Sequence, residues 1–177
     1  MNRRLRVRSM TARLAQTWST DYVGLPDDFL SERLVKLTGD DDAAVLGYLT
    51  PEAMDRAVRT PAKGKPRFYA LYGLELRLHP APDQAYAGEL IYLRALPALS
   101  PSNPGNWLLA AHPDAYLYGA LTQSAPYLRA DEHLQTWTAL FGAVLSDIET
   151  ADRAGAAARL MSDAPAGRAG PFNINRG

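Results

Sequence analysis

Residues 67–82, RFYALYGLELRLHPAP, are the stretch in which the period of the sequence changes to two. From position 74 to 79, leucine alternates with a charged residue or histidine. Such alternation is typical of a strand with one buried and one solvated face, and Tyr72–Gly73 supplies a turn before it. After a proline-rich connection, residues 86–95 favour another strand. We therefore expect a small antiparallel β-meander over 67–96.

The chain beyond the loop SPSNPGN (100–106) has a helical period instead. Pro113 can open a helix in which positions 117, 121, 124 and 128 share one face. Asp131 can cap the next helix, whose apolar stripe recurs every three or four residues: Leu134, Trp137, Phe141, Val144, Ile148 and Ala151. Only about three residues join the two helices, which predicts an antiparallel helical hairpin over 106–155.

Three further elements are expected upstream. Residues 1–14 suit a helix with a thin apolar stripe, and residues 20–38 suit extended segments broken at Pro26. Thr50 followed by Pro51 favours a short helix over 50–59. Together these elements predict an α+β fold that is mainly helical, with a C-terminal antiparallel helical hairpin or bundle and a small antiparallel sheet in the middle region. We expect a single domain over 1–158 and an extended C-terminal tail over 159–177.

Composition narrows the class of protein. The 177 residues are 47% hydrophobic and carry no formal net charge, which favours a globular domain and argues against a freestanding nucleic-acid binder. The absence of cysteine excludes disulfides and thiolate metal sites. The basic start has no apolar segment behind it, and no apolar run approaches the length of a membrane span. We expect a soluble intracellular protein with no membrane contact.

Catalytic and cofactor motifs are missing from the sequence. No phosphate loop, dinucleotide fingerprint or nucleophile elbow is present, and the histidines His79, His112 and His133 fall in three different elements. The aspartates at 40–42 lack the spacing of a calcium loop. We therefore expect no enzyme, no catalytic residues, no cofactor and no metal site. A rival hypothesis, an enzyme with an unrecognised site, predicts a deep polar pocket around His79 or His112.

The aromatic residues between 107 and 127 favour packing over base stacking. Stacking platforms for nucleic acids interleave aromatics with basic residues, and only Arg129 lies nearby. Tyrosine suits half-buried contacts between subunits. We predict that helical packing is carried by six residues: Trp107, Tyr116, Tyr118, Leu121, Trp137 and Phe141.

The ordered motifs of the chain resemble bacteriophage head–tail connector adaptor proteins. The resemblance rests on NWLL (106–109), HPD (112–114), YLYGA (116–120) and Trp137. Upstream it continues in YVGLPDDFLSERLVKLTG (22–39), YLTPEAMDR (48–56) and residues 73–100, in the same order as in that family. The similar region extends to about Ala158.

This resemblance implies a structural virion protein in the neck of a phage or a gene-transfer particle, assembled in the host bacterial cytoplasm. Its partners would be the portal protein, stopper or tail proteins, further copies of itself in a dodecameric ring, and double-stranded DNA passing without sequence specificity during genome ejection. Family members grip the portal with extended C-terminal tails. Portal contact would then fall on five tail residues: Pro171, Phe172, Asn173, Ile174 and Arg176.

The arginine-rich start leaves an alternative open. Arg3, Arg4, Arg6 and Arg8 precede the first acidic residue of the chain, Asp21. A solvated face, a contact with a neighbouring subunit and a contact with DNA would each use such a cluster. The alternative function is a small helical DNA-binding or regulatory protein that uses this start.

Overall fold

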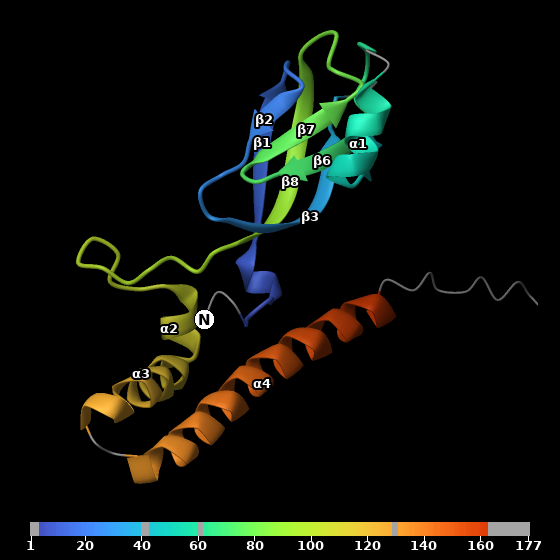
Figure 1. The fold of residues 1–177 in the computed structure, drawn as a ribbon. Coiled ribbons are helices and arrows are strands. Elements are labelled where there is room, and N and C mark those ends of the chain that lie inside the picture. The colour runs from blue at the N-terminus through green and yellow to red at the C-terminus, as the bar shows by residue number, and fades with distance from the viewer. Residues whose placement is uncertain (1–3, 40–42, 60–61, 129–130, 163–177) are drawn as a thin grey trace, which may run out of the picture. The chain divides into compact units, whose positions relative to one another are not determined.

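A computed structural model describes residues 4–39, 43–59, 62–128 and 131–162 (Figure 1). By its contacts the chain divides into two compact units, Met1–Asn106 and Trp107–Gly177. Division by contacts does not test whether the units fold independently, so the single domain expected over 1–158 stays a prediction. The first unit holds the strands and a short helix, and the second unit is helical.

The first unit contains two four-stranded sheets. One sheet has the order β1–β8–β3–β4 and is antiparallel throughout, with the bounds β1 Thr11–Trp18, β8 Tyr86–Arg94, β3 Phe29–Leu37 and β4 Ala44–Val45. The other has the order β2–β7–β6–β5, with the bounds β2 Tyr22–Gly24, β7 Glu75–His79, β6 Phe68–Tyr72 and β5 Gly47–Tyr48. Its strands β5 and β6 are parallel, and its other pairs are antiparallel. We call these two layers the β1 sheet and the β2 sheet.

The two sheets share one apolar core. Its buried residues come from both layers: Trp18, Val35, Leu37, Leu46, Tyr69, Leu76, Leu78, Tyr86, Leu90 and Tyr92. Every second residue of a strand points to the same face, so each strand contributes alternate side chains. Gly88 on β8 leaves room for the fully buried Trp18 ring, which lies where a Cβ atom would otherwise project. The unit is therefore a β-sandwich whose layers face each other across this core.

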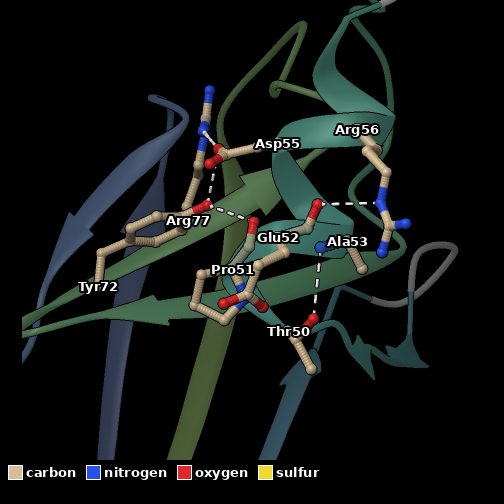
Figure 2. A network of polar contacts seen from close by, with 8 residues as sticks. All are labelled: Thr50, Pro51, Glu52, Ala53, Asp55, Arg56, Tyr72 and Arg77. Atoms are coloured by element: carbon tan, nitrogen blue, oxygen red, sulfur yellow. Dashed lines mark hydrogen bonds and ion pairs between the residues drawn. The ribbon is translucent and has the colours of Figure 1, made fainter.

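Helix α1, Pro51–Val58, packs on β6 and β7 of the β2 sheet. It begins as the sequence predicts, because the Thr50 side chain accepts a hydrogen bond from the Ala53 N–H at 3.3 Å. Figure 2 shows that the Tyr72 hydroxyl donates to the Pro51 carbonyl at 3.0 Å and to Asp55 Oδ1 at 2.9 Å. Arg77 on β7 binds the same carboxylate oxygen at 2.9 Å. These bonds tie both turns of the helix to the sheet.

The second unit consists of α2 (Trp107–Ala111), α3 (Pro113–Leu128) and α4 (Asp131–Ser162). Helices α3 and α4 follow each other closely along the chain and pack together (Figure 1). At 1.5 Å per residue, α4 is about 48 Å long and α3 about 24 Å. The predicted helical pair over 106–155 is present, and its second helix continues to Ser162.

The mainly helical fold class is wrong. The chain is 38% helix and 33% strand, and strands dominate its N-terminal half. The helix expected over 1–14 is instead an extended segment, a 3-10 turn over Arg8–Met10 (η1) and strand β1. β1 pairs with β8 at eight consecutive positions, and this long-range pairing overrides a weak local helical stripe.

The meander expected over 67–96 is also wrong in its pairing. Strands β6 and β7 form the predicted hairpin, with Gly73 in its turn at φ +64°. The third strand, β8, joins the other sheet between β1 and β3. Alternation along a sequence indicates a strand and a buried face but does not identify the strand's partner. The extended segments expected over 20–38 are present as β2 and β3.

Candidate assembly interface

In the arginine-rich start, exposed basic residues alternate with buried apolar residues. Arg4, Arg6 and Arg8 are exposed, whereas Leu5 and Val7 between them are buried. The guanidinium of Arg6 donates to the Leu5 carbonyl at 2.8 Å. The start is therefore a strip of cations anchored by apolar residues, which suits contact with an anionic partner. Arg3 lies outside the described residues.

A charged cluster crosses three strands of the β1 sheet. Glu89 on the central strand β8 is 4% exposed and binds Lys36 Nζ on β3 at 2.9 Å. Arg13 on β1 donates to its other carboxylate oxygen. The hydrogen bond from Lys36, joined by that from Arg13, lowers the pKa of Glu89 below its usual value. The cluster lines an open hollow of about 590 Å³ that also reaches Val45 on β4.

Sequence reasoning missed this cluster. Its three members are far apart in the chain and meet only because β8 lies between β1 and β3. The one local signal is an acid inside the apolar run GELIYL (88–93), since a carboxylate in a buried strand requires a cationic partner.

A second cluster, missed for the same reason, lies on the β2 sheet. The Arg77 guanidinium is 5.1 Å from the ring centroid of Tyr22 and 5.8 Å from that of Tyr72. Burial, followed by the hydrogen bond to Asp55, raises the pKa of Tyr72. The guanidinium of Arg77 contacts Asp55 on α1 and the two tyrosine rings, and so stabilises the packing of α1 on the β2 sheet.

The six predicted packing residues of the helical unit, Trp107, Tyr116, Tyr118, Leu121, Trp137 and Phe141, are all half-buried. Their role in packing stays a prediction. The face expected for α3 is wrong at Leu117, which is 55% exposed. The fully buried residues of α3 are Ala115 and Ala125, so this helix packs through small side chains, which allow close approach. Tyr127 is 88% exposed near the end of the helix.

Among the described residues, one small pocket includes His79. His79, Asp21 and Arg77 contribute to a cavity of about 210 Å³, below the usual range for ligand sites. His112 is not among its lining residues. The described part of the chain contains no group of three or more metal-ligating side chains, and none of its helices is long and apolar enough to cross a bilayer. The five predicted portal-contact residues, Pro171, Phe172, Asn173, Ile174 and Arg176, lie outside the described residues.

Both the β-sandwich and the helical unit expose aromatic or aliphatic side chains, and the start of the chain exposes basic ones. Such surfaces are typical of proteins that bind other macromolecules. Residues 1–162 match the family model described as SU10 adaptor protein. The chain belongs to this family of phage head–tail adaptors, which is structural rather than enzymatic. A comparison with curated proteins gave no match.

Proposed function

We propose that the protein is a head–tail connector adaptor that forms a ring beneath the portal of a virion or gene-transfer particle. The ring, of twelve subunits, joins the portal to the stopper or tail and continues the DNA channel through which the genome is ejected. It assembles in the host bacterial cytoplasm. The family match over residues 1–162 is the observation that carries this proposal.

The surface chemistry supports this function. An adaptor needs contact area for several partners, and both units carry large exposed apolar side chains, among them Val45 and Tyr127. A ring requires contacts between two different patches of each copy, which close when the rotation per subunit divides a full turn. The zero net charge suits a channel that releases DNA, because strong phosphate contacts would hold it.

The tail is the proposed grip on the portal. Because α4 continues to Ser162, the segment that can serve as the tail is shorter than the one expected over 159–177. Residues 163–177 are rich in glycine and proline, and Phe172 and Ile174 are apolar side chains among the last seven. In this role Pro171 restricts the backbone of the tail and Asn173 hydrogen-bonds to the portal. Arg176 pairs with a portal carboxylate.

The tail's role is tested by a binding titration against the portal encoded beside the gene. Phe172→Asp with Ile174→Asp should weaken binding at least tenfold, because two apolar anchors are lost. Asn175→Asp, the matched control, adds charge to the same segment without removing an anchor and should bind within about threefold of the natural chain. Equal affinities for all three proteins would contradict the proposed contact between the tail and the portal.

DNA contact through the start is a second candidate, favoured by the exposure of Arg4, Arg6 and Arg8. If the strip faces DNA, affinity for duplex DNA should fall steeply with salt, and replacing Arg3, Arg4, Arg6 and Arg8 by alanine should reduce that slope. Unchanged DNA affinity together with loss of ring assembly would instead assign the strip to a neighbouring subunit.

A further inference from the structure

The β1 sheet ends in two open edges among the residues that the structure describes. β1 has β8 on one side and no strand on the other, and β4 has only β3. At eight residues, β1 is much longer than the other three edge strands, β2, β4 and β5. It contains no proline, its pairing with β8 has no bulge, and Arg13 is its one charged residue. A long edge with so little protection is a template for another strand.

The hydrogen-bond pattern shows which backbone N–H and C=O groups of β1 point away from the sheet. The Thr38 N–H donates to the Ala87 carbonyl, so Ala87 directs its backbone toward β3. Its neighbour Gly88 therefore faces β1 and pairs with Gln16. By alternation, the backbone groups that point away from the sheet are those of Thr11, Arg13, Ala15 and Thr17, and the side chains of these four residues are exposed.

The opposite edge is centred on Val45. The Leu46 N–H donates to the Val35 carbonyl at 2.9 Å, so Leu46 faces β3 and Val45 directs its backbone outward. The Val45 side chain is 65% exposed. In the β2 sheet, Tyr48 on the edge strand β5 and Phe68, the partner of Gly47 on β5, are 50% and 41% exposed.

Exposed apolar side chains gather at these margins. The described residues of the first unit include six large ones: Tyr22, Val45, Tyr48, Phe68, Leu74 and Leu99. Three lie on or beside β4 and β5, and two lie on or beside β2, which follows β1 after a short turn. Only Leu99 lies in the segment after β8. Apolar edges at opposite margins of one unit suit contact between copies in a row.

The geometry points to a second copy of this chain as the occupant of the β1 edge: we infer that β1 of one subunit pairs with β4 of the next, so that the β1 sheet continues around the ring. Successive strands of this sheet alternate in direction, and there are four of them. A copy added in the same orientation therefore places its β1 antiparallel to the preceding β4, the more stable ladder. The inference rests on the proposed ring and assigns its contact.

Cysteine cross-linking tests this contact in the portal-bound assembly, since the natural chain has no cysteine. Ala15 and Val45 share the outer face of the sheet, as their pairings with Glu89 and Lys36 show. Oxidation of Ala15→Cys, Val45→Cys with copper phenanthroline should give a ladder of covalent oligomers on a denaturing gel. Each single variant should stay monomeric, because β1 meets β4 and not another β1.

The outcomes separate this inference from the proposed function. Dimers from Ala15→Cys alone would show a two-fold β1–β1 contact and overturn it. A ring seen by electron microscopy without cross-links in the double variant would overturn it while leaving the adaptor function intact. A natural chain that forms no ring on the portal would overturn both.

A charged substitution at the inferred contact tests the same pairing independently of cross-linking. Val45→Lys places a charge at the inferred contact. Because the new ammonium lies opposite Lys36, the unfolding midpoint of the free variant is measured first and ring occupancy is compared at a temperature where it is fully folded. Ring occupancy on the portal should fall at least tenfold. Leu99→Lys, at another exposed aliphatic residue but in the segment after β8, should keep full occupancy. Full occupancy with Val45→Lys would refute the contact.

Discussion

At the residue scale, Gly88 on β8 makes room in the core for the Trp18 ring of the neighbouring strand β1. A Cβ atom at this position would lie 2.1 Å from Cδ2 of Trp18, a distance that real contacts never reach. The Trp18 ring is fully buried and cannot swing into solvent. Nothing in the sequence marks this glycine, because the neighbour that requires it is seventy residues earlier and is brought close only by the β1–β8 pairing.

Gly88→Ala should therefore destabilise the protein by about 1–3 kcal/mol or more, since the core must shift to admit a methyl group. Urea denaturation followed by tryptophan fluorescence measures the loss. Gly24→Ala on β2 is the matched control, because a Cβ atom there meets nothing within 4 Å. Equal midpoints for the two variants would contradict the packing described for Trp18.

Tyr92 links stability to alkaline pH. Its hydroxyl donates to Asp28 Oδ1 at 2.9 Å, and burial together with this bond raises its pKa to about 12. Because the unfolded chain loses this proton near pH 10, the stabilisation is complete below pH 10 and is lost as pH rises toward 12.

Tyr92→Phe should lower the free energy of unfolding by about 1 kcal/mol at pH 8, the usual contribution of one hydrogen bond. Denaturation at pH 8 and pH 11 should show that the gap narrows at the higher pH. Tyr127→Phe, at an exposed tyrosine, should change neither value. A gap that widens with pH would show that the sign is wrong.

At the element scale, a helix or hairpin can be predicted from the sequence when the residues that stabilise it are close together in the chain. The start of α1 is predictable because Thr50, Pro51 and the first-turn acid Glu52 all act within one turn. The β6–β7 hairpin is predictable because its turn and its leucine alternation are contiguous. β1 is not, since the side chains it turns inward are Ala12, Leu14, Gln16 and Trp18, a weak apolar pattern that only β8 completes.

Thr50→Ala should cost about 1 kcal/mol, because the Ala53 N–H loses its acceptor at the start of α1. Thr50→Ser should keep most of the cap and recover the stability. Thermal unfolding of the three proteins measures this order. A serine variant as unstable as the alanine variant would show that the methyl group, not the hydroxyl, is what matters at this position.

At the scale of the whole molecule, the sequence resemblance and the family match agree on a phage adaptor, although the predicted fold class was wrong. Motifs such as NWLL (106–109) and HPD (112–114) indicate ancestry without specifying sheet topology. The charged cluster around Glu89 and the two open margins depend on strand order, which no local pattern encodes. The surface that we propose for assembly therefore follows from the strand order of the folded chain and not from a local pattern.

The central claim is that this chain forms a ring on a portal. Mixing the full chain with the portal encoded beside its gene, followed by electron microscopy of single particles, tests it most directly. We expect a closed ring of twelve copies beneath the portal, coaxial with its channel. A well-formed portal that carries no added density at saturating concentrations of the chain would contradict it.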